Sequence, residues 1–424
     1  MITELARLLG LHAAMRRAER LPPERLRRLQ ERKLKALVAH AHATVPFYRR
    51  RFEGIGLDPR DIRSLDDLEA LPVVTKAELQ AAGTEARLSS SFPAGALEHG
   101  RTSGSSGRPF EIFRDRHFAR VRRAAFFRAL CSGPYRPGHS ILLVSGIPKR
   151  RQPRWMRWHS VSSEVEPERL LETINTLRPR FLYGFLTPLR QAAALVRDEG
   201  RSVHQVQGVY TTAESLDRRT REALESAFGA PVFDIYGTTE AGPVAWECAA
   251  HAGYHVAEDT TIVELLPSDT PGAHRLVATS LDLWGMPLLR YDVGDLAVDG
   301  PRERCACGRT LRRLARIEGR LVDCVRLADG RALSPYHLTL AVEEVPGIDR
   351  YQIVQTALDR ILVRAQGPGR DDPATPARVA TAIHGVMGAG VAVQTRFEPD
   401  LDPPRGRKFR VVECRLAAQT PVPA

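Results

Sequence analysis

PVFDIYG, residues 231–237, is the last of four short apolar runs that decide the fold of this chain. The other three are ILLVSG at 141–146, RFLYGFL at 180–186 and VQGVYTT at 206–212. Segments with helical spacing of apolar residues separate them, for example 187–199 and 217–228. Apolar strands that alternate with helices predict a largely parallel sheet covered by helices, so the expected fold class is α/β.

The segments on either side of this core have different patterns. The first ~70 residues have helical spacing, and Pro46 interrupts it. Beyond Gly242 the runs TIVELL, HRLVATSL and GDLAV predict short antiparallel strands, and VRLADGRAL predicts a hairpin that turns at Asp329-Gly330. The last hundred residues indicate a strand, a helix, two strands, a helix and a strand. We therefore expect a large multi-layer N-terminal domain, 1–318, with a β subdomain at about 243–318, and a small α+β C-terminal domain, 319–424.

The composition is that of a globular protein, with 43% hydrophobic and 26% charged residues. No apolar run approaches the ~20 residues that a membrane span needs. Glu4 and Arg7 interrupt the apolar start, which predicts an amphipathic helix and not a secretory signal, so a cytoplasmic location without membrane insertion is expected.

The chain is basic, with a net charge of +12. The 62 basic residues include five lysines, which leaves 57 arginines, and most of them are interleaved with acids. No nucleic-acid-binding motif is recognisable, so nucleic acid is not an expected partner. A basic cluster at 149–157, KRRQPRWMR, could still guide an anionic ligand or partner.

The loop after the 231–237 strand is a candidate ligand-binding site, because ligand sites in open α/β sheets form at the carboxyl ends of strands. It reads YGTTEAG, residues 236–242. Tyr236 could stack on a base, Thr238 and Thr239 could bond a phosphate, and Glu240 could hold a hard cation. The alternative is a capped helix start, with Thr238 as the cap.

A second candidate is the glycine- and serine-rich stretch HGRTSGSSGRP, 99–109, ahead of a strand-like run at 110–113. Glycines let the backbone turn and point its N–H groups at an anion, and the hydroxyl and guanidinium groups add donors. The phosphate-binding residues would be Ser103, Gly104, Ser105, Ser106, Gly107 and Arg108. The alternative is a flexible surface loop.

Further along, the motif RYDVGD at 290–295 ends in Asp295, whose carboxylate could accept hydrogen bonds from two ribose hydroxyls. The alternative is an aspartate in an ordinary β-turn. RIEGR at 316–320 lies at the proposed domain joint.

Six cysteines in a long chain argue against a disulfide framework. Cys305 and Cys307 flank one alanine, and Cys248 lies upstream with two histidines nearby, His251 and His255. Three thiolates and one imidazole make a closed, structural zinc site. The alternative is a set of buried cysteines and surface histidines. Cys131, Cys324 and Cys414 have no partner in this interpretation.

The order of the motifs resembles a known family. It runs TSGSSGRP, TTAE at 211–214, YGTTEAG, RYDVGD, RIEGRLVD and GRKFR. This order resembles the adenylate-forming enzymes, and VPFYRRRF with LPVVTKAEL resembles their phenylacetate-CoA ligase-like branch. The resemblance implies an ATP-dependent ligase that converts a carboxylic acid into an acyl-adenylate and passes the acyl group to coenzyme A.

The same resemblance implies roles for individual residues. The 103–108 loop would cradle phosphates, Thr239 and Glu240 would serve the α-phosphate and Mg²⁺, and Lys408 would be the adenylation lysine, with Arg407 as its rival. The remaining nucleotide-binding residues would be Glu214, Tyr236, Gly237, Thr238, Asp295, Arg316 and Arg320. The C-terminal domain would swing about a hinge near Asp323, after Gly319-Arg320. The zinc ligands would be Cys248, His255, Cys305 and Cys307.

This chain departs from the family pattern at Arg108, where a lysine is usual, and at Val322, where this branch often has an acidic residue. A small carboxylic acid is the expected partner, and the protein would be a monomer or a homodimer. Transfer to an amine or to a carrier-protein thiol, release of the adenylate as end product, and a non-catalytic nucleotide-binding scaffold remain as alternatives. The sequence does not identify the acid.

Overall fold

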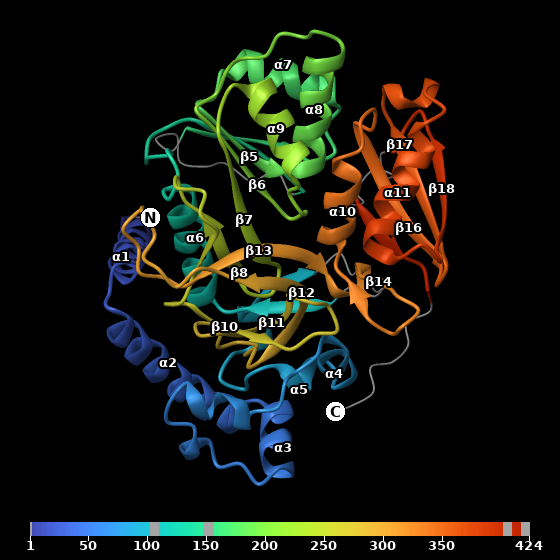
Figure 1. Ribbon diagram of the computed structural model, residues 1–424. Helices are drawn as coiled ribbons and strands as arrows, with labels where there is room; N and C mark the ends of the chain where they lie inside the picture. The colour runs from blue at the N-terminus through green and yellow to red at the C-terminus, as the bar shows by residue number, and fades with distance from the viewer. Residues whose placement is uncertain (1, 102–109, 147–156, 402–408, 417–424) are drawn as a thin grey trace.

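The computed structural model describes residues 2–101, 110–146, 157–401 and 409–416 (Figure 1). Its centre is one sheet of eleven strands in the order β10-β11-β12-β13-β9-β8-β7-β6-β5-β3-β4. The strands are β3 (Ile141–Ser145), β4 (Trp158–Ser162), β5 (Phe181–Phe185), β6 (Gly208–Thr212), β7 (Val232–Thr238), β8 (Gly242–Glu247), β9 (Tyr254–Val256), β10 (Thr261–Leu266), β11 (His274–Ser280), β12 (Tyr291–Asp299) and β13 (Arg313–Arg320).

The parallel part of the sheet runs from β4 to β7, which confirms the expected α/β class. Alternate residues of its strands enter different cores, as period-two strands require. Leu142 and Val144 pack with the helices above the sheet in Figure 1, whereas Ile141 and Leu143 pack with the opposite layer. The upper helices are α7 (Pro167–Leu177), α8 (Leu186–Asp198) and α9 (Arg218–Phe228), and the opposite layer contains α6 (Arg116–Leu130).

The antiparallel strands expected at about 243–318 continue this sheet, because β7 pairs antiparallel with β8. A second core joins these strands to the N-terminal helices, with Tyr48, Phe110 and Leu281 among its members. The N-terminal helices are α1 (Ile2–Ala18), α2 (Pro23–Thr44), α3 (Pro46–Gly54), α4 (Lys76–Ala81) and α5 (Thr84–Arg87). No helix in the described part of the chain has the length and apolar character that a membrane span requires.

A separate hairpin precedes α6. Its strands, β1 (Glu98–Arg101) and β2 (Glu111–Arg114), pair antiparallel, so the glycine- and serine-rich stretch connects them. That stretch, with its predicted phosphate-binding residues 103–108, lies outside the described residues.

The last part of the chain has its own core and its own four-stranded sheet, ordered β18-β17-β16-β19. The expected hairpin is present as β14 (Val325–Arg326) and β15 (Ala332–Leu333), and Gly330 in its turn has a φ of 88°. The other elements are α10 (Pro335–Glu343), β16 (Arg350–Ala357), β17 (Arg360–Gln366), α11 (Thr375–Met387), β18 (Ala392–Phe397) and β19 (Val412–Cys414). In Figure 1 this part, in orange and red, lies beside α8 and α9.

Candidate active site and metal centre

A cavity of about 3030 Å³ lies where the parallel strands end, and Ser145, Phe185, Thr212 and Tyr236 line it. Residues of the last part of the chain, such as Tyr336, line its other side. A pocket for one small ligand measures roughly 300–1,000 Å³. This cavity therefore has room for a nucleotide and a further substrate together.

The YGTTEAG motif forms a tight hairpin between β7 and β8, so the helix-start alternative is wrong for this loop. The Thr238 hydroxyl accepts a hydrogen bond from the Ala241 N–H at 2.9 Å. A Cβ on Gly237 would lie 2.6 Å from the Gly242 carbonyl oxygen, which explains the glycine there. The turn brings Thr239 and Glu240 to the cavity wall as a hydroxyl and a carboxylate, both oxygen ligands that suit Mg²⁺.

Two neighbours hold this hairpin. Arg114 of β2 donates to the Thr239 carbonyl at 2.7 Å, and the Tyr291 hydroxyl donates to Glu240 at 3.3 Å. Both neighbours lie in or beside motifs identified in the sequence. The hairpin, the RYDVGD motif and the strand that leaves the glycine- and serine-rich stretch therefore meet at one place.

Asp295 lies within β12, so it does not form the ordinary β-turn that the sequence left open. A β-bulge sets the orientation of its side chain, because three residues of β12, 293–295, lie opposite a single residue of β11, Leu276. Its carboxylate accepts a 2.6 Å hydrogen bond from the Tyr236 hydroxyl and forms a 2.9 Å ion pair with Arg320. Burial and the Asp295 charge raise the pKa of Tyr236 well above its usual value, so Tyr236 remains a donor. Two motifs predicted separately are thus hydrogen-bonded to each other.

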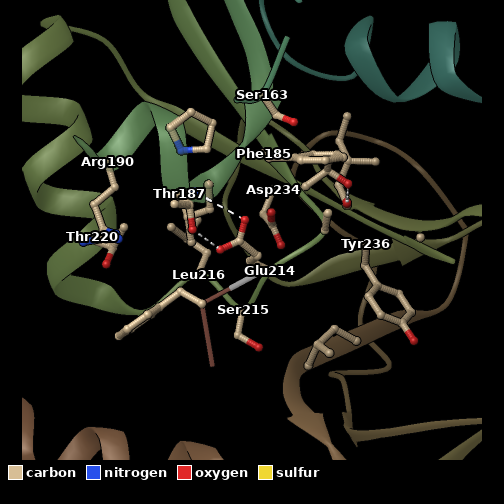
Figure 2. Close-up of a pocket in the computed structure, with 18 of the residues that line it drawn as sticks. Ser163, Phe185, Thr187, Arg190, Glu214, Ser215, Leu216, Thr220, Asp234 and Tyr236 are labelled. Atoms are coloured by element: carbon tan, nitrogen blue, oxygen red, sulfur yellow. Dashed lines mark hydrogen bonds between the residues drawn. The ribbon is translucent and has the colours of Figure 1, made fainter. Parts of the chain in front are cut away.

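Glu214 borders the cavity but caps a helix in this structure. It accepts hydrogen bonds from the Thr187 N–H at 3.3 Å and the Thr187 hydroxyl at 2.5 Å, at the start of α8 (Figure 2). Ala213, just before it, has a φ of 75°, which is uncommon for a residue with a side chain. Such strained backbone is concentrated at functional sites, because the surrounding structure must hold it there.

The residues at the proposed domain joint contact both parts of the chain. Arg316 pairs with Glu318 at 2.7 Å, and its guanidinium lies 4.4 Å from the centre of the Tyr336 ring. Asp323 forms an ion pair with Arg410. Val322 is 55% exposed.

Lys408 and Arg407 lie outside the described residues, but the next residue, Phe409, is described. Its ring is flanked by two guanidiniums, 5.3 Å from Arg190 of α8 and 4.6 Å from Arg350 of β16. Phe409 also lines the cavity. The residue that follows Lys408 is therefore attached to both parts of the chain at the cavity wall.

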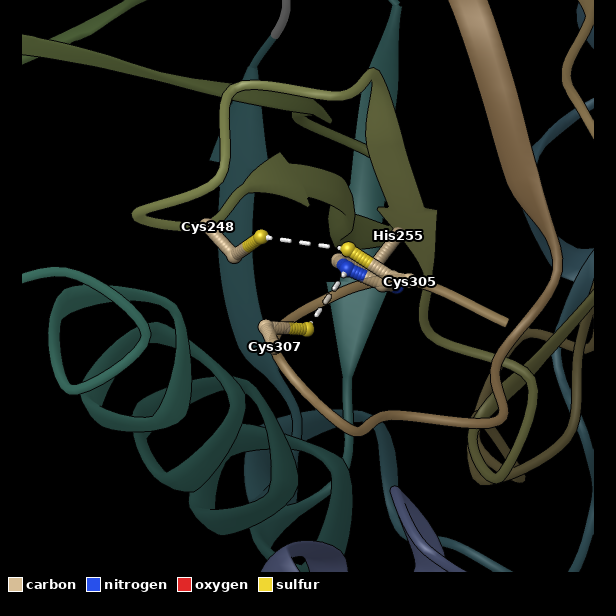
Figure 3. A group of neighbouring side chains, drawn as sticks. All are labelled: Cys248, His255, Cys305 and Cys307. Atoms are coloured by element: carbon tan, nitrogen blue, oxygen red, sulfur yellow. Dashed lines mark hydrogen bonds between the residues drawn. The ribbon is translucent and has the colours of Figure 1, made fainter. Parts of the chain in front are cut away.

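The four predicted zinc ligands Cys248, His255, Cys305 and Cys307 come together (Figure 3), and their ligand atoms lie within 4.8 Å of one another. The Sγ atoms of Cys248 and Cys305 are 3.8 Å apart, and Cys307 Sγ lies 3.3 Å from His255 Nε2. A tetrahedral zinc with Zn–S of about 2.3 Å and Zn–N of about 2.0 Å requires edges of about 3.8 Å and about 3.5 Å. The donor set and its spacing therefore fit zinc.

The alternative ligand His251 points elsewhere. Its ring stacks on Phe233 at 4.9 Å, and its Nδ1 is 3.9 Å from Glu247. Burial raises the pKa of Cys248 to about 12 and lowers that of His255 to about 4, so without a cation these two ligands are neutral at pH 7. A dication would displace the thiol protons on binding.

Sequence reasoning missed two cavity residues, Asp234 and Arg122, and also Arg114, which holds the β7–β8 hairpin. Asp234 carried a usable signal, because it stands two residues before Tyr236 and so shares its face of β7. Arg114 and Arg122 carried no such signal, since they are two of 57 arginines.

No family model matches the chain. It is 31% identical over 369 residues to the phenylacetate-coenzyme A ligase of Thermus thermophilus, covering 79% of each protein. Among solved structures it resembles 2-hydroxyisobutyryl-CoA ligase in a postadenylation state with an acyl-AMP, at a TM-score of 0.79, 21% identity and coverage of 94% and 92%. The thioesterification state of that ligase gives a TM-score of 0.65 at 20% identity and the same coverage.

The fold and the motifs that it assembles are those of the adenylate-forming ligases. Their order along the chain had indicated this superfamily. Within it, the chain belongs to the phenylacetate-coenzyme A ligase family.

Proposed function

We propose that this chain activates a carboxylic acid with ATP and transfers the acyl group to coenzyme A. A carboxylate oxygen attacks the α-phosphorus and expels pyrophosphate, and the coenzyme A thiol then attacks the acyl carbon and releases AMP. One observation carries the proposal. Tyr236, Glu240, Asp295 and Arg320, from three motifs that are distant in sequence, line one cavity at the carboxyl ends of the parallel strands.

The chemistry needs charge neutralisation and positioning more than a covalent catalyst. Glu240, with the Thr239 hydroxyl beside it, would hold Mg²⁺, which supplies positive charge to the phosphates when bound. Asp295 would accept the ribose hydroxyls, and Glu214 and Tyr236 would border the adenine. The phosphates would lie against the 103–108 loop, with Arg316 nearby.

The adenylation lysine would be Lys408, and residues 319–424 would turn about Asp323 between the two half-reactions. Support comes from Phe409, the next residue along the chain, whose ring lies at the cavity wall between Arg190 and Arg350. A compact ammonium suits a position between a carboxylate and an α-phosphate better than a planar guanidinium does.

The decisive experiment is ATP–pyrophosphate exchange with a panel of aryl and aliphatic acids, followed by detection of acyl-coenzyme A. We expect acid-dependent exchange and a thioester. Tight ATP binding without exchange for any acid would instead favour a nucleotide-binding scaffold. Exchange without a thioester would favour an amine or a carrier protein as acceptor.

Lys408→Ala tests the assignment of the lysine. It should abolish adenylate formation but spare thioester formation from a supplied acyl-adenylate. The matched control is Arg407→Ala, which should keep both. If Lys408→Ala adenylates normally and Arg407→Ala does not, the role belongs to Arg407.

We further propose that the Cys248, His255, Cys305 and Cys307 cluster holds a structural zinc, because its donors are closed in and lack an open position. Metal analysis should give one equivalent of zinc, which the double change of Cys305 and Cys307 to Ser should remove. Folded, metal-free wild-type protein would contradict this site.

A further inference from the structure

Arg122 is a cationic side chain in the cavity wall, on the helix α6 that follows the β1–β2 hairpin. It lies against the β7–β8 hairpin, since a Cβ built on Gly242 would be 2.9 Å from Arg122 Cγ and 3.0 Å from its Nε. Gly242 thus leaves room for this arginine beside Thr239 and Glu240. An arginine here is close to the place proposed for the reaction.

The guanidinium of Arg122 has no carboxylate partner within the described residues, and its Nε is fully buried without an acceptor. Some buried arginines of the chain do have one, whereas the buried Arg87, Arg114 and Arg313 donate only to hydroxyl or carbonyl oxygens within the described residues. Arg128 pairs with Asp259 at 2.6 Å, and Arg309 pairs with Glu19 at 2.9 Å. The segments that are not described contain a single acidic residue, Asp402.

Arg122 is partly exposed, but desolvation of an unpaired cation is costly, so an anionic ligand in the cavity would supply the counter-charge that the described residues do not. Burial, with the nearby Arg114 charge, lowers the pKa of Arg122 to about 10, and the group therefore stays cationic at pH 7. Arg114 uses one of its N–H groups on the Thr239 carbonyl. Of these two arginines, Arg122 is the one that lines the cavity.

Aromatic side chains continue the wall next to Arg122. Phe126, one helical turn further along α6, packs edge-on against Tyr183 with ring centroids 4.8 Å apart, and both line the cavity. The wall therefore offers an apolar surface with one fixed cation. A monocarboxylic acid whose only anionic group is the reacting carboxylate leaves that cation unpaired.

We propose that Arg122 selects acids that carry a second ionised oxygen-acid group, so that the substrate is a dicarboxylic acid with an apolar body. This inference rests on the proposed function, because it assigns the substrate class of the same site. The reacting carboxylate lies at the Thr239–Glu240 turn and the second carboxylate pairs with Arg122.

Pyrophosphate exchange with two matched pairs of acids tests the proposal. In each pair a monocarboxylic acid is compared with its dicarboxylic counterpart: phenylacetate with 4-carboxyphenylacetate, and hexanoate with adipate. The wild type should prefer the dianionic member of at least one pair by tenfold or more in kcat/KM. Arg122→Ala should lower kcat/KM for that acid at least tenfold, mainly through KM, and leave the monoanionic acid and the KM for ATP within twofold. Arg116→Ala, an exposed arginine at the start of the same helix, should change neither.

Two outcomes would overturn the proposal: preference for the monoanionic acid in both pairs, or equal loss for both acids in Arg122→Ala. Calorimetric binding of 4-carboxyphenylacetate and adipate in the presence of AMP separates this inference from the proposed function. Binding that weakens at least tenfold in Arg122→Ala, with no exchange for any acid, would support Arg122 and refute the ligase. Binding of neither acid, or binding unaffected by Arg122→Ala, would refute the role of Arg122 even in an active ligase.

Discussion

Asp234→Asn should change how stability depends on pH, because Asp234 is an acid held inside the cavity wall. Its carboxyl accepts hydrogen bonds from the Thr211 hydroxyl at 2.7 Å and from the Tyr254 hydroxyl at 3.0 Å. Burial, with the nearby Glu247 charge, raises its pKa from 3.8 to about 7. Asparagine keeps an acceptor for Thr211 and places an N–H group against the Tyr254 oxygen, so the hydrogen bonds can be retained without the charge.

The sign follows from proton binding. Between pH 3.8 and about 7 the folded state holds a proton on Asp234 that the unfolded chain has lost, so the free energy of unfolding falls as pH rises through this window. One pKa unit corresponds to about 1.4 kcal/mol, which makes the fall from pH 5 to pH 8 about 3 kcal/mol in the wild type. The variant lacks this contribution. It should match the wild type near pH 5 and be more stable by about 3 kcal/mol at pH 8.

Urea unfolding at pH 5, 6, 7 and 8, followed by tryptophan fluorescence, measures the difference between the two proteins at each pH. The matched control is Asp269→Asn, whose side chain is 77% exposed and which should not alter the pH dependence. A stability difference between Asp234→Asn and wild type that stays constant from pH 5 to pH 8 would refute the reasoning.

Two further substitutions test the geometry of the site. Tyr236→Phe removes the 2.6 Å donor to the buried Asp295 carboxylate and should lower the free energy of unfolding by about 1–3 kcal/mol, measured by urea unfolding. An unchanged unfolding midpoint would mean that Arg320 alone satisfies Asp295. Gly242→Ala combines a φ of 78° with a Cβ contact on Arg122 and should cost more than Gly56→Ala, which has a φ of 68° and open space around it. Equal losses in thermal unfolding temperature would contradict the tight contact.

Much of the fold could be predicted because its signals are local. The apolar runs at 141–146 and 231–237 are long enough to be buried strands, and turn residues bound them. The continuity of the sheet could not be predicted, since the pairing of β7 with β8 depends on a three-residue turn in which Thr238 mimics a helix cap. A cap and a turn use the same hydroxyl, so the sequence left both open.

The site was predictable where a residue type is rare and unpredictable where it is common. Cys305 and Cys307 stand out among six cysteines, and the structure brings them to Cys248 and His255. Arg122 could not be singled out within RVRRAAFFR, because its meaning depends on Gly242, which is 120 positions away. The role of Asp295 in accepting the Tyr236 hydroxyl likewise depends on a bulge that only strand pairing reveals.

Phe409, seated between Arg190 and Arg350, has a consequence for timing. Each such cation–ring contact contributes roughly 0.5–2 kcal/mol. The cost of breaking both contacts would therefore slow the proposed rotation of residues 319–424 by a factor between a few and several hundred. Because Lys408 is the preceding residue, we expect the Phe409 contacts to restrain the proposed rotation of residues 319–424. The dwell time of the enzyme in one half of its cycle would then be set by the strength of a non-reacting side chain, which evolution can adjust without disturbing any group that touches the substrates.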